Sequence, residues 1–517
     1  MKTFNCRLSL FVGLLLAGTL TAYDFEYDAG DIEGEKESTG ITYTLSVSKG
    51  DLGTSYDFDT KEGVTSGAPS GIDISVGSGG ATGTMEYTND SLPTSNFTIS
   101  MNGKLVPPSG GSGTQPTWGA RGNAKAPFHI KSDQNGGEKD IVVPHGTSVK
   151  YSAYQGTSLQ NSTWSVTGFP SKEAEEIRFN KSFWLSLWPW SAPNIINPEP
   201  GVYNISATSK DPAGGSDSAQ MTVVGGEFKE HSSHAYGFDD YTNWNKNATD
   251  YYGTKTGKCT LPYASVRSGY QGRSNFTLTP SPISRDIEFS SSTDRLVFSP
   301  ATTKSSRNVI FNASSGWFSS SATLSAKLDN TTFANLSVRS YNLKTITVGV
   351  RLVHETSYTS TDIPTASIQQ TLSEVYKQAC VNVTVTRLPT ITINFDLNSD
   401  GKVDVGSWMT QEMTIIKNAG DAAGYDYIIF IVSNPNDGSL GYMNFSQKYG
   451  FVHGGGGQTV AHELGHGQGL RHIFELDATG GYNNAPAKGV DDNNLMHPYA
   501  GANRVKLRMS QWNNLNN

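Results

Sequence analysis

The 517-residue sequence predicts a multidomain protein, with all-β sandwich modules on the N-terminal side and an α/β domain at the C-terminal end. Three observations support this fold class. Before residue 343, short alternating runs of apolar and polar residues are separated by Gly, Ser, Asp and Pro, as in strands joined by turns. After it, β-branched runs alternate with helical patterns. The length also exceeds one ordinary core, since a domain averages about 150 residues.

Composition and charge narrow the class of partner. Charged residues make up only 17% of the chain, which also contains 55 Gly, and this composition is typical of extracellular β-rich modules. The formal net charge is -8 at pH 7. We therefore expect neither nucleic acid nor an anionic membrane surface as a partner.

Residues 1–22 have the layout of a secretory signal peptide. Lys2 and Arg7 precede the apolar run 8–17, and small residues follow it. A membrane anchor, the alternative, needs about 20 apolar residues, more than this run contains. The mature protein is therefore expected to be secreted, with no stable membrane span.

Four segments are expected between the signal peptide and the α/β domain. Residues 23–125 form a Gly/Ser-rich β region with strand and turn signals. In residues 126–226, the runs DIVVPHGTSVKYSAY, STWSVTG, GVYNISATS and SAQMTVVGG are spaced like the strands of an immunoglobulin-like sandwich, and the ending resembles PKD or Ig-type modules of secreted bacterial proteins. Residues 227–268 are polar and are expected to be a linker. A second sandwich-like module is expected over residues 269–343, from runs such as SNFTLTP and RLVFSP.

A tryptophan cluster lies inside the immunoglobulin-like segment, where FWLSLWPW contains Trp184, Trp188 and Trp190. If exposed, these rings would give the β modules a contact with a glycan or a partner surface. If buried, they are core and loop packing, which is the favoured interpretation because aromatic rings usually contribute to cores.

The α/β domain is expected over residues 344–517. KTITVGVRLV predicts a buried strand, and DIPTASIQQTLSEVYKQA predicts a helix with Asp362 as its cap and Pro364 in its first turn. One face of that helix is apolar: Ile368, Leu372, Val375 and Ala379. The strands VNVTVTRL and ITINFDL, the helix SWMTQEMTIIKNAG and the strand DYIIFIVSN then follow in order.

The segment QTVAHELGHGQGLRH contains the candidate metal ligands and the candidate catalytic residue. His462 and His466 are four residues apart, so one helical turn projects both imidazoles from the same face toward one ion. Gly469 can adopt the left-handed conformation that ends a helix, which would return His472 to the same ion. Three imidazoles around zinc leave a fourth position for water, and Glu463 would accept the proton of that water as the general base.

HELGHGQGLRH resembles the extended zinc signature of the metzincin metalloproteases. Metzincins also have a methionine in a tight turn beneath the zinc, and DDNNLMHPY offers Met496 for that place. The resemblance covers residues 344–517 and implies a mixed sheet, an active-site helix and a cleft for an extended peptide. Some metzincins have a tyrosine two residues after the methionine; here Pro498 occupies that place, and Tyr499, one residue further, is the candidate. Ile473 follows the third histidine, and the subfamily stays unassigned.

His231 and His234 are expected at the surface, because no acidic or cysteine partner with recognisable spacing accompanies them. His453 and His497 are also expected at the surface, because as extra ligands they would close the open position. Upstream, GSLGYMNFSQKYGFVHGGGGQ resembles the edge strand that lies along the substrate in metzincins, and an edge strand can pair with a peptide. The glycines 454–457 would be a flexible lip of the cleft or a simple connector.

FDLNSDGKVDV matches the first half of a calcium loop of the EF-hand type. The ligands would be five residues, with Lys402 contributing its carbonyl: Asp396, Asn398, Asp400, Lys402 and Asp404. Position twelve is Ser407 instead of a bidentate acid, so an Asp/Asn-rich turn is the alternative. Any calcium would stabilise the fold rather than take part in catalysis.

Cys259 and Cys380 are the two cysteines of the mature chain, since Cys6 lies in the signal peptide. They are compatible with one disulfide. GKCTLPY around Cys259 faintly resembles the prodomain cysteine that keeps some metzincins latent, which is the competing interpretation.

The function expected from these features is that of a secreted zinc endopeptidase, which hydrolyses peptide bonds of a protein substrate by attack of a zinc-activated water. The alternative is an extracellular adhesion or carbohydrate-binding protein with a vestigial zinc domain. A zinc hydrolase of a non-peptide amide is a third interpretation that shares the same metal site.

Overall fold

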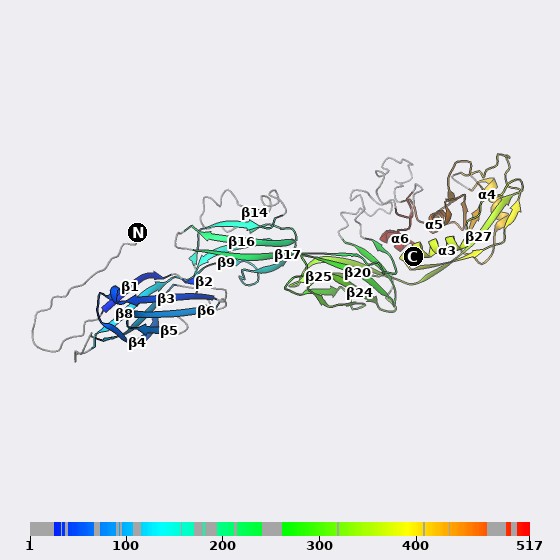
Figure 1. The fold of residues 1–517 in the computed structure, drawn as a ribbon. Helices are drawn as coiled ribbons and strands as arrows, with labels where there is room; N and C mark the ends of the chain where they lie inside the picture. The colour runs from blue at the N-terminus through cyan, green and yellow to red at the C-terminus, as the bar shows by residue number, and fades with distance from the viewer. Residues whose placement is uncertain are drawn as a thin grey trace, which may run out of the picture. The chain divides into compact units, whose positions relative to one another are not determined.

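The chain is mostly β strand and divides into two compact units in a computed structural model (Figure 1). The first unit is Met1–Ile141, Ser148–Pro198 and Val202–Met221, and the second is Val142–Thr147, Glu199–Gly201 and Thr222–Asn517. The structure describes residues 25–32, 34–36, 40–66, 73–88, 93, 96–106, 115–156, 158–169, 179–180, 194–210, 215–239, 261–317, 320–406, 409–433, 435–472, 493–497 and 504–516.

The N-terminal region is a sandwich of two sheets with one core. The first sheet has the order β1 (Phe25–Ile32), β8 (Thr117–Ala124), β7 (Phe97–Val106), β4 (Asp57–Ser66). The second has the order β2 (Glu35–Lys36), β3 (Gly40–Ser48), β6 (Gly80–Thr88), β5 (Asp73–Gly77), and the short helix α1 (Lys49–Leu52) follows β3. Apolar residues alternate along these strands, so one face of each sheet enters a shared core that includes Tyr43, Ile99 and Trp118.

The second module of the first unit is also built from antiparallel strands. One sheet joins β12 (Ser158–Leu159), β11 (Val149–Gln155), β15 (Asn194–Ile195) and β14 (Phe179–Asn180), with β9 (Phe128–Ser132) paired to β11. The other begins with β13 (Ser162–Thr167), β16 (Gly201–Ser209) and β17 (Ser216–Glu230). Strand β17 has 15 residues and continues into the second unit, where β10 (Ile141–Pro144) also pairs with it.

The third β module, residues 222–341, opens the second unit. Its first sheet continues from β17 to β20 (Gln271–Thr279), β24 (Arg307–Ala313) and β22 (Leu296–Ser299). Its second sheet has the order β18 (Phe238–Asp239), β19 (Tyr263–Arg267), β26 (Thr331–Tyr341), β25 (Ser320–Leu328), β21 (Ile287–Ser291), β23 (Thr302–Thr303). Residues of both sheets share one core, in which Phe276 lies against Phe228 and Phe289 at ring-centroid distances of 5.1 Å each.

The expected linker 227–268 is wrong for its described residues. The end of β17, β18 and β19 are sheet strands, and inward residues such as Phe228 and Val266 are at most 1% exposed. His234, expected at the surface, is 9% exposed, and its Nδ1 accepts a hydrogen bond from the Arg273 amide at 3.0 Å. These strands pair with residues far along the chain, such as β26, so a local polar composition does not reveal them.

Residues from 344 onward form a mixed sheet with helices on both faces. The strand order is β28 (Val381–Arg387), β27 (Lys344–Glu355), β30 (Tyr427–Ile431), β32 (Tyr449–Val452), β31 (Gly441–Met443), with β29 (Ile391–Ile393) also paired to β27. Only β31, at the edge, pairs antiparallel among these strands. The helices are α3 (Thr365–Tyr376), the 3-10 turn η3 (Lys377–Ala379), α4 (Gln411–Gly420), α5 (Gly456–Gly467) and α6 (Met509–Asn516).

The side chains of β30 alternate between two cores. Ile429 and Ile431 enter the core with α3, α5 and α6, whereas Ile428 and Phe430 enter the core with α4. The predicted apolar face is confirmed, since Ile368, Leu372 and Val375 on α3 and Ala379 in the following turn η3 are each 0% exposed. The predicted cap is wrong. Pro364 is at the N-cap, and Asp362 accepts a hydrogen bond from Arg387 at 2.6 Å instead.

Glu355 is the last residue of β27, and we expect its carboxylate to make the stability of the fold depend on pH. Burial raises its pKa, but hydrogen bonds from the Ser357 amide and hydroxyl and from the Thr356 hydroxyl outweigh burial and lower the pKa to about 2. A lowered carboxyl pKa stabilises the fold above the unfolded value and loses that contribution as the pH falls toward 2.

We therefore expect the free energy of unfolding to fall between about pH 4.5 and pH 2, and Glu355→Gln to flatten that part of the curve. Urea unfolding across this range measures it. The matched control is Glu374→Gln, on the exposed side of α3. If the free energy of unfolding of Glu355→Gln fell as steeply as that of wild type over this pH range, the lowered pKa of Glu355 would be contradicted.

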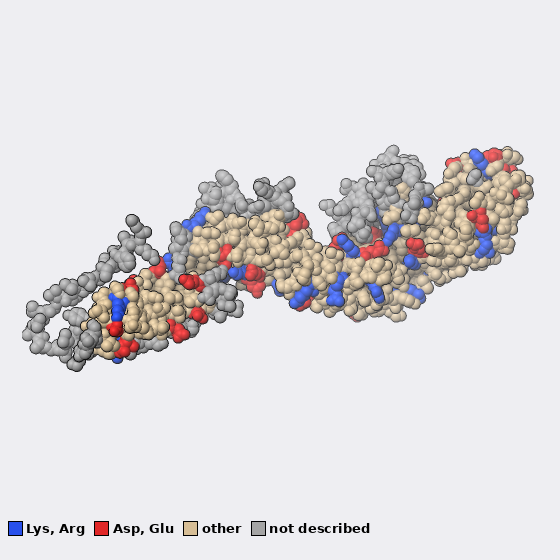
Figure 2. Space-filling model, viewed as in Figure 1, with Lys and Arg blue, Asp and Glu red and all other residues tan. Residues whose placement is uncertain are grey.

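Basic and acidic residues are interspersed over the surface that Figure 2 draws, including that of the third β module. Among the described residues, no helix is long and apolar enough to cross a membrane. The predicted signal peptide, residues 1–22, lies outside the described residues.

Candidate metal centre

Helix α5 carries His462, Glu463 and His466, and it begins in a run of glycines. Gly455 is the N-cap with φ 69, and a Cβ on Gly457 would lie 2.6 Å from Thr371 Oγ1 and 2.9 Å from the Ser367 carbonyl oxygen on α3. The glycine run is therefore the beginning of a helix packed closely on α3, in place of the expected lip or connector.

The other residues of α5 bury it in the domain. Val460, Ala461 and Leu464 are 0% exposed, and the Tyr376 hydroxyl donates to the Ala461 carbonyl at 2.7 Å. Both motif histidines are buried as well. The helix is thus packed into the core of the domain.

Gly469 turns the chain back after the helix. Its φ is +87, and the Leu470 amide donates to the Gly465 carbonyl at 2.8 Å, which closes the helix end. The turn brings His472 beside the two helical histidines. The structure therefore brings together the three histidines predicted as ligands.

The three imidazoles meet through their Nε2 atoms. His472 Nε2 lies 3.0 Å from His462 Nε2 and 3.1 Å from His466 Nε2. The Nδ1 of His462 lies 2.8 Å from the Leu495 carbonyl oxygen, and that of His466 lies 2.8 Å from the Leu470 carbonyl oxygen. A carbonyl oxygen can only accept, so each Nδ1 carries the proton and each of these Nε2 atoms presents a lone pair.

This donor set fits a metal cation. Converging lone pairs repel one another unless a positive charge lies between them, and a carbonyl behind Nδ1 is the usual partner of a metal-ligating histidine. Tetrahedral ligands of zinc, each 2.0–2.1 Å from the ion, lie about 3.3 Å apart, so the nitrogen atoms need to separate by only a few tenths of an ångström. The ligand atoms of His462, His466 and His472 all lie within 4.8 Å of one another, close enough to hold one metal ion.

Burial lowers the pKa of His462 well below its ordinary value, and the neighbouring His466 and His472 lower it further. A neutral imidazole is the form that binds a metal. The same burial raises the pKa of Glu463 to about 8, opposed by the positive charge of Arg504. The Glu463 carboxylate lies against the edge strand, since a Cβ on Gly441 would be 2.7 Å from its Oε1.

Met496 lies beneath the histidines in a short segment, 493–497. It is 0% exposed, and a Cβ on Gly465 would lie 2.7 Å from its Sδ. Its amide donates to Asn494 Oδ1 at 2.9 Å. The residue predicted for the turn beneath the metal therefore packs directly on the helix that carries the motif.

The site also contains groups that the sequence interpretation missed. The carbonyls of Leu470 and Leu495 are backbone groups and have no sequence signal. Arg504 is 6% exposed, and its guanidinium donates to the His497 carbonyl at 2.8 Å. A single arginine outside any motif offers no pattern to recognise, so only the fold reveals it beside Glu463.

Other predicted site residues lie elsewhere or outside the described residues. Tyr499, Ile473 and the tryptophan cluster are outside them. His453 is separate from the triad, with Nδ1 2.8 Å from the Ser433 carbonyl oxygen. Cys380 is a buried free thiol whose pKa burial raises to about 12, and Cys259 is outside the described residues.

The predicted calcium loop is a network of turn hydrogen bonds. Asp396 accepts from the Gly401 amide at 2.9 Å, Asn398 and Asp400 accept from other loop amides, and Asp404 accepts from the Asn436 side chain at 2.8 Å. The Lys402 carbonyl accepts from the Tyr358 hydroxyl at 3.3 Å. Glu412, which the sequence interpretation missed, accepts from the amides of Leu397 and Asp404 and anchors the loop on α4. The calcium site stays a prediction.

Fold and site together define a multidomain, mostly β protein whose C-terminal mixed sheet, covered by helices, carries a three-histidine cluster on α5 and the turn after it. No family model matches the chain, and no curated protein matches it.

Solved structures resemble the chain only weakly, at TM-scores of 0.14–0.22. The I9-I11 tandem of titin matches with a TM-score of 0.16 and 11% identity, over 62% of this chain and 98% of that chain. The insect immune protein hemolin matches with a TM-score of 0.19 and 12% identity, over 62% and 75%. The N-terminal eight Ig domains of Down Syndrome Cell Adhesion Molecule match with a TM-score of 0.22 and 10% identity, over 64% and 38%. At TM-scores this low, the likeness does not bear on function.

Proposed function

We propose that the chain is a secreted, metzincin-like zinc endopeptidase. The observation that carries the proposal is the convergence of three imidazole Nε2 atoms, two of them with Nδ1 turned to a carbonyl, while the buried Glu463 follows His462 on the same helix. Zinc in a three-histidine site supplies Lewis acidity toward a water molecule and a substrate carbonyl.

Residues of the chain would supply proton transfer and peptide binding. Glu463 would accept a proton from the attacking water as general base and return it to the leaving amine as general acid. Among the described strands, β31 pairs with β32 alone, so its outer edge can pair with an extended peptide. Burial of the carboxylate against this strand brings the proton acceptor close to the bound peptide.

The second candidate function is an extracellular adhesion or carbohydrate-binding protein in which the histidine site is vestigial. The observation favouring it is the architecture, because three β-sandwich modules make up the described part of the chain before residue 344. In that case the β modules would bind a glycan or protein surface without peptide hydrolysis.

Metal content and casein cleavage of the full-length mature protein test the proposal. We expect about one zinc per chain, cleavage that stops when a chelator removes the metal, and recovery when zinc is returned. His466→Ala should lose both zinc and cleavage, whereas the control His231→Ala, in the third β module, should keep both. A wild-type chain that binds no zinc would exclude the enzyme, and zinc binding without cleavage of any protein would favour the adhesion candidate.

A further inference from the structure

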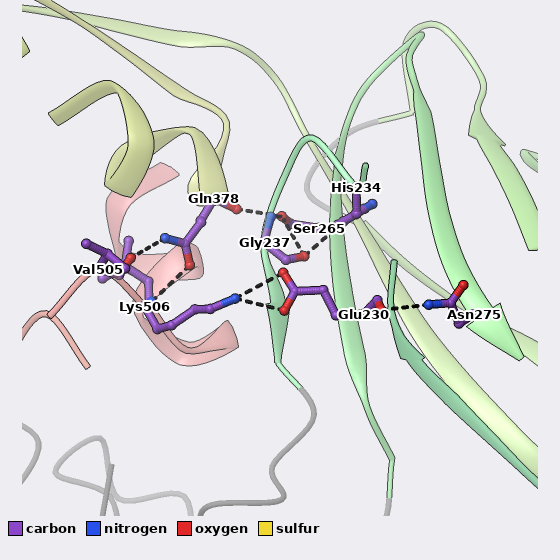
Figure 3. A network of polar contacts seen from close by, with 9 residues as sticks. Glu230, His234, Gly237, Ser265, Asn275, Gln378, Val505 and Lys506 are labelled. Carbon is purple, nitrogen blue, oxygen red and sulfur yellow. Dashed lines mark hydrogen bonds and ion pairs between the residues drawn. The ribbon is translucent and has the colours of Figure 1, made fainter. Parts of the chain in front are cut away.

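The third β module and the C-terminal domain are joined by a buried polar contact within the second unit (Figure 3). The Ser265 hydroxyl, on β19, donates to the Gln378 carbonyl at 2.5 Å. Ser265 also accepts from the Gly237 amide at 2.7 Å, and a Cβ on Gly237 would lie 2.5 Å from the Trp512 ring. All of these groups are buried, so the joint leaves no room for a larger side chain or for water.

The side chain of Gln378 continues from this joint to the C-terminal segment 505–507. Its Nε2 donates to the Val505 carbonyl at 2.5 Å, and its Oε1 accepts from the Leu507 amide at 3.0 Å. The side chain thus uses both ends of its amide to hold two backbone groups of one segment. Gln378 is 7% exposed, and an amide buried to this extent is costly unless both ends are paired.

Segment 505–507 is in turn bonded to the segment beneath the histidines. The Leu495 amide donates to the Lys506 carbonyl at 2.8 Å, and the Lys506 amide donates to the Asn493 carbonyl at 2.9 Å. The Leu495 carbonyl accepts the proton of His462 Nδ1. A continuous series of hydrogen bonds therefore runs from Ser265 to His462.

We propose that Gln378 is a positioning residue of the metal centre, through which the third β module orients His462. The proposal rests on the proposed function in taking His462 as a metal ligand. The carbonyl that fixes the tautomer and ring of His462 belongs to Leu495, and the position of Leu495 depends on the segment that Gln378 holds. The third β module is then a structural part of the enzyme rather than an attached binding module.

A second contact crosses the same joint at the surface. Lys506 Nζ lies 2.8 Å and 3.0 Å from the two carboxylate oxygens of Glu230, and both side chains are exposed, by 39% and 43% (Figure 3). Ion pairs exposed to this extent contribute little. We therefore assign the positioning to Gln378, and Glu230→Gln should change zinc affinity less than twofold.

The chain contains a matched control for Gln378. Gln369, on α3, also holds a strand with both ends of its amide, since its Nε2 donates to the Val383 carbonyl and its Oε1 accepts from the Val385 amide, each at 2.8 Å. That strand is β28, which pairs with β27. Replacing either glutamine by methionine keeps the length of the side chain and removes the same kind of hydrogen bonds.

The experiment uses four full-length mature chains: wild type, Gln378→Met, Gln378→Glu and Gln369→Met. Zinc affinity is measured by competition with a chromophoric chelator, and exchange of the Leu495 amide is measured on the metal-free chains by mass spectrometry. We expect Gln378→Met to bind zinc about tenfold more weakly and to exchange Leu495 about tenfold faster. Gln369→Met should match wild type in both, although its thermal stability falls. Gln378→Glu keeps the acceptor for the Leu507 amide and should lie between wild type and Gln378→Met.

Equal zinc affinity of Gln378→Met and wild type, or an equal loss in Gln369→Met, would overturn the positioning role. Zinc binding by wild type without proteolysis would overturn the proposed function alone. If wild type bound no zinc, the proposed function would fall, and exchange at Leu495 would still decide whether Gln378 orders the support of His462.

Discussion

Replacement of Glu463 by glutamine is expected to lower kcat for peptide hydrolysis by about 10²- to 10⁴-fold while zinc stays bound. The three imidazoles are untouched by this substitution, so the metal keeps its ligands. A glutamine has nearly the shape of glutamate but cannot accept a proton from water, and general acid–base catalysis contributes an effect of this size. Zinc content and steady-state cleavage of a peptide substrate measure the two quantities separately.

Glu412→Gln is the matched control for this prediction. Glu412 is 1% exposed and belongs to the same domain, but it holds the Asp396–Asp404 loop rather than the histidine site. We expect this variant to lose stability and to keep kcat within about twofold, since it touches no reacting group. Full activity in Glu463→Gln would contradict the general-base role, and loss of zinc from that variant would show that the carboxylate supports the metal itself.

Replacement of Phe276 by alanine is expected to destabilise the second unit by about 3–5 kcal/mol. Phe276 is 1% exposed, and its ring lies between Phe228 and Phe289 in the core of the third β module. A Cβ on Gly226 would lie 2.8 Å from the Phe276 ring, so the backbone of β17 is already packed against it. Removal of the ring leaves a cavity that these strands can only partly close.

Val297→Ala, in β22 of the same module, is the control for this prediction. Val297 is 57% exposed, and surface substitutions usually change stability by about 0.5 kcal/mol or less. Chemical unfolding measured by tryptophan fluorescence compares the two variants. If the third β module supports the metal centre through Gln378, Phe276→Ala should also lose zinc during the same unfolding transition. Zinc release at a separate, higher denaturant concentration would show that the two parts unfold independently.

Local patterns predicted the elements of the C-terminal domain well. The apolar spacing of residues 368–379 identified the buried face of α3, because a helix repeats its face every three to four residues. The residues that cap helix ends were harder to predict. Asp362 resembled a cap in the sequence, but in the fold Arg387 from β28 competes for its carboxylate.

Short strands whose partners lie far along the chain could not be predicted from the sequence. Strands β18 and β19 have two and five residues, too few for an alternating pattern to stand out among polar neighbours. Their place is decided by pairing between Tyr263–Arg267 and residues 337–341, more than 70 positions further along the chain. For the same reason the predicted linker is wrong and His234, expected at the surface, is buried.

The sequence by itself determined which residues are proposed as metal ligands and as the acid–base residue, because helical periodicity fixes the direction of His462 and His466 and the absence of a side chain on Gly469 permits the turn to His472. Only the tertiary structure decided what orients those residues. The carbonyls of Leu470 and Leu495, the guanidinium of Arg504 and the amide of Gln378 act through backbone atoms or single side chains that carry no local pattern. Their positions depend on packing between segments far apart in the chain, which no spacing within one segment encodes.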